Sequence, residues 1–180
     1  IIEGAAIAAR ILNCKKIVFA IEDNKPDAIE KLNSAITDAS EKSLYPIELS
    51  ICVAPTKYPS GGEKQTIELV TGKQVPKGKL PASLGIVLQN VATLHSIYRA
   101  VVDAKPLFER VVTLTGDLIQ EPGNYWIPFG TKIEDLISRF SIDKSELEGV
   151  ILGGPMMGQS TNEFKTPVTK STNCIIFNRG

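Results

Sequence analysis

The segment from Tyr58 to Gln65 holds the residues best suited to contact a ligand. Gly61 and Gly62 carry no side chain, so the backbone can adopt positive φ angles there and approach a bound molecule closely. A helix is expected to begin directly after them, with its first amides pointing toward that molecule. Glu63 would repel a phosphate but would accept hydrogen bonds from the hydroxyls of a ribose or ribityl chain. A plain loop before a charge-stabilised helix start explains the same residue types.

A second candidate, the segment from Leu88 to Thr93, is suited to an anion. An apolar stretch is followed by the polar residue Asn90 and a helix start without acidic residues, which is typical of phosphate sites in α/β proteins. Asn90 and Thr93 could add side-chain donors to the backbone amides. An ordinary N-cap at Asn90 accounts for that residue equally well and leaves Thr93 unexplained.

A third group of polar residues, Glu22 to Lys25, follows an apolar strand candidate. Open α/β sheets bind ligands at the carboxyl ends of their strands, so this segment is also a candidate. The alternative is a strand-to-helix turn in which Asp23 or Asn24 caps the next helix. His95 stands alone within a predicted helix and is expected to be a surface or packing residue.

The elements that must position these groups have an α/β pattern over the first 105 or so residues. Helical periodicity predicts helices over residues 1–12, 26–40 and 62–70, and a further helix after Asn90. The apolar face of that last helix is predicted to hold Val91, Leu94, Tyr98 and Val101. Strands are predicted over residues 17–21, 47–53 and 85–88. These runs are apolar without alternation, which is typical of parallel strands covered on both faces.

The pattern changes after Leu107. Residues 110–115 and 125–129 alternate on either side of a turn, which predicts a hairpin. Thr131 and Glu134 have the spacing of a capping box, so a short helix should follow with Ile133, Leu136, Ile137 and Phe140 facing inward. Strands are predicted over residues 150–152 and 173–177, with a glycine-rich loop over 153–158. We therefore expect an α/β domain over 1–107, a small β-grasp-like module over 108–155, and an extension over 156–180.

Composition excludes several classes of protein. Twenty basic residues balance twenty acidic ones, so the net charge gives no reason to expect binding to nucleic acid or to an anionic membrane surface. No apolar run has the roughly 20 residues needed to span a bilayer. The three cysteines are far apart in the sequence, which favours buried or half-buried thiols in a reducing compartment over a metal site or a disulfide framework. The start at Ile1, without a signal peptide, is that expected of an internal fragment.

Several motifs, in this order, resemble the C subunit of the Rnf complex, a membrane ion pump that couples ferredoxin oxidation to NAD reduction. The resemblance runs from end to end of the chain and includes long, unusual motifs. They are IEDNKPDA from Ile21, KYPSGGEKQ from Lys57, Thr71-Gly72 with Val75-Pro76 and Leu80-Pro81, QNVAT from Gln89, Lys105-Pro106, VTLTGD from Val112, PGNY from Pro122 and GGPMMG from Gly153.

That subunit is similar to the flavin-carrying NADH dehydrogenase subunit of complex I. The resemblance implies a Rossmann-like FMN-binding domain with a parallel sheet, followed by the β-grasp module called SLBB. It implies that Tyr58, Gly61, Gly62 and Glu63 lie beside flavin and nicotinamide, and that Asn90 and Thr93 contact the flavin phosphate and ribityl chain. Two departures concern the same region: Gln89 stands where complex I usually has Asn, and Ala92 where it usually has Glu.

The resemblance also implies function and setting. FMN and NAD(H) would be the cofactor and substrate, and electrons would pass to four-iron clusters that lie in the full-length protein but not in this chain. Partners would be the other Rnf subunits and a ferredoxin-linked electron carrier, at the cytoplasmic face of the membrane. Because the glycine-rich flavin loop of the family is upstream, the chain alone is expected to fold, to be inactive, and to bind FMN weakly or not at all.

Two other functions compete with this interpretation. The chain could belong to a related electron carrier that feeds a different reductase from the same scaffold. It could also be a docking module without redox chemistry, in which both domains serve as a scaffold within a larger assembly. Eight cysteines with cluster spacing downstream of Gly180 would favour electron transfer, and their absence would favour the scaffold.

Overall fold

The computed structural model describes residues 1–42 and 44–179. The chain divides into two compact units, Ile1–Lys105 and Pro106–Gly180. This division lies close to the predicted domain boundary near Leu107. Within the described residues, no helix combines the length and apolar character needed to cross a membrane.

The first unit is built on a parallel βαβ arrangement, as predicted. Strands β1 (Lys16–Glu22) and β2 (Glu48–Ala54) pair in parallel, with Phe19 opposite Ile51. Helix α2 (Pro26–Glu41) connects them and begins at a proline, which the first turn of a helix tolerates. The remaining elements are α1 (Ile2–Ile11), α3 (Glu63–Thr71), the short 3₁₀ helix η1 (Pro81–Leu84) and α4 (Val91–Val101).

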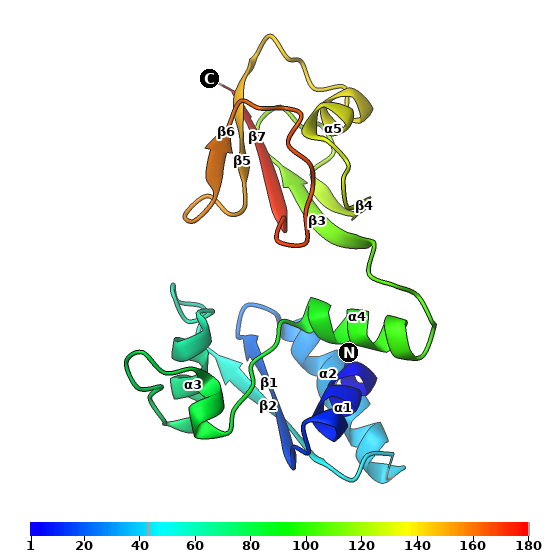
Figure 1. Cartoon of the computed structure of the whole chain (residues 1–180), viewed down its shortest axis with the longest axis vertical. Helices are drawn as coiled ribbons and strands as arrows, with labels where there is room; N and C mark the ends of the chain where they lie inside the picture. The colour runs from blue at the N-terminus through cyan, green and yellow to red at the C-terminus, as the bar shows by residue number, and fades with distance from the viewer. Residues whose placement is uncertain (43, 180) are drawn as a thin grey trace. The chain divides into compact units, whose positions relative to one another are not determined.

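Apolar side chains from three helices cover one face of this sheet. The buried centre is small and consists of Ala5 on α1, Phe19 on β1 and Leu94 on α4. Partly buried residues of β1, β2 and α2 surround it, so α1, α2 and α4 lie on the same side of the strands. Figure 1 shows α3 on the opposite side of the β1–β2 pair. Helices thus lie on both sides of β1, as its non-alternating sequence predicts, but the cover on the α3 side is incomplete, because Ala20 is exposed.

Two expectations for the first unit are wrong. Residues 85–88 do not form a strand, and Val87 is 50% exposed. The physical reason is that a strand needs a partner, and β1 and β2 pair only with each other among the described residues. The apolar face of α4 is also narrower than predicted. Leu94 is buried, whereas Val91 and Val101 are 51% and 62% exposed.

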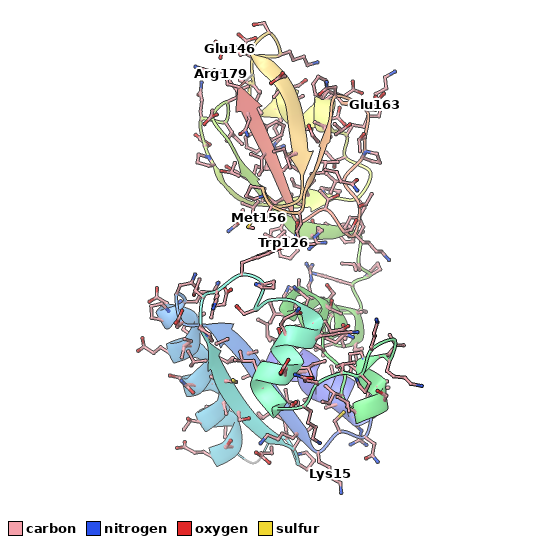
Figure 2. All side chains as sticks on the ribbon, turned by 90° about the vertical axis from the view of Figure 1, so that its left-hand side faces the viewer. Lys15, Trp126, Glu146, Met156, Glu163 and Arg179 are labelled. Carbon is pink, nitrogen blue, oxygen red and sulfur yellow. The ribbon has the colours of Figure 1, made fainter. Side chains whose placement is uncertain are left out.

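The second unit contains a five-stranded sheet in the order β4-β3-β7-β5-β6. The predicted hairpin is confirmed, because β3 (Glu109–Thr115) and β4 (Gly123–Pro128) pair antiparallel. Helix α5 (Ile133–Arg139) buries three of the four predicted side chains, while Phe140 is partly buried and packs edge-on against Tyr125. The other strands are β5 (Leu147–Leu152), β6 (Gln159–Thr161) and β7 (Cys174–Arg179). Figure 2 shows Glu146 beside Arg179, and their side chains form an ion pair at 2.8 Å.

Residues 156–180 differ from the expected extension. They supply β6 and β7, and β7 lies at the centre of the sheet between β3 and β5. Ile175 and Phe177 of β7 are fully buried, so this segment is part of the core of the second unit. The predicted capping box also shifts by one position, because the Lys132 amide, and not that of Thr131, donates to a carboxylate, at 3.2 Å from Asp135 Oδ2.

Candidate functional site

The loop between β2 and α3 carries four of the six predicted site residues: Tyr58, Gly61, Gly62 and Glu63. Hydrogen bonds within the loop hold its shape. The Ser60 amide donates to the carbonyl of Lys57 at 2.7 Å, and the Ser60 hydroxyl donates to the carbonyls of Lys57 and Pro55. The hydroxyl of Thr66 on α3 donates to the Ser60 carbonyl at 2.8 Å, which fixes the loop to the helix.

Gly61 and Gly62 provide space and not an unusual backbone conformation. Neither has a positive φ angle, contrary to the expected use of these glycines. A Cβ atom at Gly61 would meet nothing within 4 Å, so this side of the loop is open to a ligand. A Cβ atom at Gly62 would lie 2.4 Å from Gln65 Oε1, so this position packs against the start of α3.

The first turn of α3 presents unused backbone donors. The Thr66 amide donates to the Gly62 carbonyl at 2.8 Å, but within the described part of the chain the amides of Glu63, Lys64 and Gln65 have no acceptor. Such amides favour a polar or anionic ligand. The exposed carboxylate of Glu63 lies in the same turn and opposes a negative charge there.

The first turn of α4 has fewer donors to offer. Asn90 is the N-cap, and its Oδ1 atom accepts from the Ala92 amide at 2.9 Å. The Thr93 amide donates to the Asn90 carbonyl at 2.9 Å. Two backbone donors of this turn are therefore already paired. A ligand would meet the side-chain NH₂ group of Asn90, the exposed Thr93 hydroxyl and the backbone amide of Val91.

The carboxyl ends of β1 and β2 are joined by Asp23. Its Oδ1 atom accepts from the Thr56 hydroxyl at 2.6 Å and from the Thr56 amide at 3.1 Å. These hydrogen bonds lower the pKa of Asp23 below its ordinary value, chiefly through the Thr56 hydroxyl. The alternative in which Asp23 or Asn24 caps α2 is wrong, because the N-cap is Lys25. The sequence offers no signal for this link, since its residues lie 33 positions apart.

A cleft of about 1470 Å³ in the first unit brings several of these segments together. Of the six predicted residues it is lined by Gly61 and Asn90, whereas Tyr58, Gly62, Glu63 and Thr93 are not part of its lining. Ser60 and Thr66, which sequence reasoning missed, also line it. The walls are mainly apolar and include all of β1.

The described residues show no cluster of His, Cys, Asp or Glu that could hold a metal ion. The thiols of Cys52 and Cys174 are half-buried, as predicted, and burial raises the pKa of Cys174. Cys14, in contrast, is exposed.

Comparison with known proteins assigns the part of the chain that holds this site to a family. The profile of the Nuo51 FMN-binding domain, from complex I, matches residues 1–99, which include all six predicted residues. The chain is 44% identical over 98% of its length to the C subunit of the ion-translocating oxidoreductase complex of Pasteurella multocida and to that of Salmonella arizonae. It spans 20% and 25% of the lengths of these relatives.

The same fold occurs in a solved structure. An NAD⁺-reducing [NiFe]-hydrogenase in the air-oxidised state superposes with a TM-score of 0.76 over 97% of this chain and 34% of the hydrogenase chain, at 19% identity. The sequence relatives bear out the resemblance to the Rnf C subunit, and the family profile supports an FMN-binding, oxidoreductase-related role. The chain belongs to the family of Nuo51 FMN-binding domains.

Proposed function

We propose that the chain forms one wall of the FMN site in a subunit that carries electrons between NAD(H) and iron–sulfur centres. The subunit would belong to a membrane-associated, ion-translocating ferredoxin:NAD oxidoreductase. The observation that carries this proposal is the match of residues 1–99 to an FMN-binding domain, together with the relatives' name as a subunit of an ion-translocating oxidoreductase complex.

The residues have distinct tasks in this proposal. Bound FMN would supply the exchange between two-electron and one-electron transfer, and the protein would position and tune it. Gly61 would let the flavin approach the backbone, since nothing lies within 4 Å on its open side. Tyr58 and Gly62 would lie beside flavin and nicotinamide, and Glu63 would accept from sugar hydroxyls.

Asn90 and Thr93 would hold the phosphate and ribityl chain from the start of α4. The side-chain NH₂ group of Asn90 and the Thr93 hydroxyl would donate to the phosphate and ribityl chain, because the backbone amides of Ala92 and Thr93 are already paired at the start of the helix. A helix N-terminus still favours the phosphate charge, and no acidic residue lies in the first turn of α4 to oppose it.

The second unit would be an SLBB module. One helix packed on a five-stranded mixed sheet is compatible with a β-grasp arrangement. The iron–sulfur ligands would lie in other parts of the polypeptide. The protein would be peripheral at the cytoplasmic face, held by the other subunits, with a ferredoxin-linked carrier as its redox partner.

The proposal is tested by flavin binding to the chain and to the polypeptide encoded by the complete gene. We expect the complete protein to retain FMN on purification and to be reduced by NADH, and the 180-residue chain to bind FMN weakly or not at all. Sub-micromolar binding by the 180-residue chain would refute the idea that half of the site lies elsewhere. A complete protein without FMN and without reduction by NADH would overturn the function and leave the scaffold alternative.

Glycine substitutions in the complete protein locate the site. We expect Gly61→Ala to weaken FMN binding by at least about tenfold, or 1.4 kcal/mol, because the added methyl occupies the open side of the loop. The unfolding midpoint should not change, because that methyl meets no protein atom within 4 Å. Gly154→Ala is the matched control, since its Cβ also meets nothing, and it should bind FMN normally.

A further inference from the structure

The polar segment from Glu22 to Lys25 stands at the carboxyl end of β1. Three of its four side chains are engaged with one another, because the Lys25 ammonium group pairs with the Glu22 carboxylate and donates to Asn24 Oδ1 at 2.9 Å. Asp23 instead reaches Thr56, which lies in the loop between β2 and α3. Asp23 is therefore the side chain by which this segment acts on the candidate site.

Asp23 extends the hydrogen bonding between β1 and β2 beyond the end of the strands. Its amide donates to the carbonyl of Ala54, the last residue of β2, at 2.8 Å. The next residue, Pro55, has no amide hydrogen, so backbone pairing cannot continue there. The Asp23 carboxylate then accepts from both donors of Thr56, the hydroxyl at 2.6 Å and the amide at 3.1 Å. A side chain thus fixes the direction in which the loop leaves β2.

The other end of the same loop is attached to α3. The Thr66 hydroxyl donates to the Ser60 carbonyl at 2.8 Å, and the Ser60 hydroxyl turns back to two carbonyl groups at the start of the loop. Tyr58 lies between the two attachment points, Thr56 and Ser60, and Gly61 follows directly. The attachments therefore hold the part of the loop that carries predicted site residues.

Asp23 holds the loop from outside the cleft. Ser60, Gly61 and Thr66 line the cleft, whereas Asp23 and Thr56 are not part of its lining. The hydrogen bonds from Thr56 lower the pKa of Asp23, so at neutral pH its carboxylate is ionised and only accepts hydrogen bonds. An effect of Asp23 on a molecule in the cleft must therefore pass through the loop.

Flavin and nicotinamide depend on this loop to different extents in the proposed function. FMN has a second anchor at the start of α4, where Asn90 and Thr93 would hold its phosphate and ribityl chain. The proposed contacts of NAD(H) are all in the loop and in the first turn of α3, at Tyr58, Gly62 and Glu63. Displacement of the loop should therefore weaken the nucleotide more than the flavin.

We propose that Asp23 is a positioning residue for the nicotinamide nucleotide: through Thr56 it holds the loop in the position that binds NAD(H), without touching the nucleotide itself. The inference rests on the proposed function. It requires that loss of Asp23 weakens NAD(H) while FMN is retained. A general loss of stability would instead lower the occupancy of both.

Titration of the FMN-loaded complete protein with NAD⁺, followed by flavin absorbance, tests the role of Asp23. We expect Asp23→Ala to raise the Kd of NAD⁺ by about tenfold, because the displaced loop no longer matches the nucleotide, and to leave the FMN content unchanged. The KM for NADH should rise with the Kd, and kcat with ferricyanide as electron acceptor should not change. Asp23→Asn keeps an oxygen that both Thr56 donors can reach, so it should restore the wild-type Kd.

Two further variants complete the series. Asp27→Ala is the matched control, because it removes the same charge from the exposed first turn of α2 and should leave the Kd of NAD⁺ unchanged. Thr56→Val removes the shorter of the two hydrogen bonds to Asp23 and should raise that Kd, even where Asp23→Ala does not fold. An unchanged Kd in Thr56→Val and in Asp23→Ala would overturn the proposal. So would loss of FMN together with NAD⁺, or an Asp23→Asn protein as weak as Asp23→Ala, which would assign the effect to the charge.

Hydrogen exchange of residues 55–62 in the complete protein needs no nucleotide. We expect Asp23→Ala to accelerate exchange in this segment by at least about tenfold, and Asp23→Asn to exchange like the wild type. Equal exchange in wild type and Asp23→Ala would refute the attachment of the loop. A wild-type protein that binds neither FMN nor NAD⁺ would overturn the proposed function, and with it this role of Asp23, even if the loop responds. A wild type that binds both, with an unchanged Kd in Asp23→Ala, would overturn the positioning role alone.

Discussion

Substitution of Gly4 by alanine tests how closely α1 and α4 pack. A Cβ atom at Gly4 would lie 1.9 Å from the Leu94 carbonyl oxygen, whereas real Cβ atoms essentially never come within 3.0 Å of another atom. The two helix backbones must therefore separate by about 1.1 Å at least. No rotamer change can relieve the overlap, because the opposing atoms belong to the backbone of Leu94.

The expected change in the free energy of unfolding combines two opposing effects. Alanine in place of glycine inside a helix normally stabilises by about 1 kcal/mol. Overpacking of a buried contact costs about 1–3 kcal/mol, and here the upper end applies because the displaced helix carries Leu94, part of the small buried centre. We therefore expect a net loss of about 2 kcal/mol in the free energy of unfolding. For a unit of this size, that corresponds to a decrease of about 10 °C in Tm.

Two spectroscopic signals separate the two units. Of the five α-helices in the described chain, four lie in the first unit, so far-ultraviolet circular dichroism at 222 nm reports mainly on its unfolding. The single tryptophan, Trp126, lies in the second unit and reports on it by fluorescence. Gly4→Ala should lower the helical transition and leave the Trp126 transition unchanged, and Gly61→Ala should change neither. A Gly4→Ala protein as stable as the wild type, or more stable, would refute the close approach of the two helices.

Three further changes follow from the structure. Gly116→Ala should destabilise the second unit by at least about 2 kcal/mol in a urea titration followed by Trp126 fluorescence, because φ is +119° and the new Cβ would lie 2.2 Å from the carbonyl oxygen of a β7 residue. Asn90→Ala should cost about 0.5–2 kcal/mol in the helical transition, because the Ala92 amide loses its cap. Thr56→Val should raise the carboxyl pKa of Asp23, measured by NMR, toward its ordinary value.

The lowered pKa of Asp23 also fixes the sign of a pH effect. The charged carboxylate is favoured in the folded state, so its contribution to stability is present above the unfolded pKa of about 3.9 and is lost as the pH falls through the lower folded value. Thr56→Val should therefore reduce the acid sensitivity of the first unit in this range. An unchanged Asp23 titration in Thr56→Val would contradict the hydrogen bonds assigned to this pair.

The parts of the fold that the sequence predicts are those decided within one or two turns of chain. Pro26 at the start of α2 and the cap at Asn90 are local features, and both are where the sequence places them. Gly72 ends α3 with φ of +67°, a conformation that glycine adopts without strain. The hairpin of β3 and β4 is also local, because its strands follow one another in the sequence.

Long-range pairing accounts for the errors. The segment 173–177 has the sequence of a strand, but nothing in it indicates that β7 lies between β3 and β5 at the centre of a sheet. Residues 85–88 have the composition of a strand and form none, because a strand exists only where another backbone offers hydrogen bonds. A short stretch of sequence shows that a segment favours a strand, but not which other strand it would pair with.

The same holds for the candidate site: the sequence predicts which residue types are present, but not which of their donors are already hydrogen-bonded. The sequence predicts a phosphate at α4 and hydroxyls at α3, from the absence of acidic residues in one turn and the presence of Glu63 in the other. Among the described residues, three amides in the first turn of α3 have no acceptor, whereas at α4 those of Ala92 and Thr93 are paired and that of Val91 is open. An anion at α4 would therefore be held by the Val91 amide, by side-chain donors and by the helix dipole, while an anion at α3 would find more amides but also the carboxylate of Glu63. Removing that charge by Glu63→Gln is the change that separates the two arrangements, because only a phosphate at α3 would then bind more tightly.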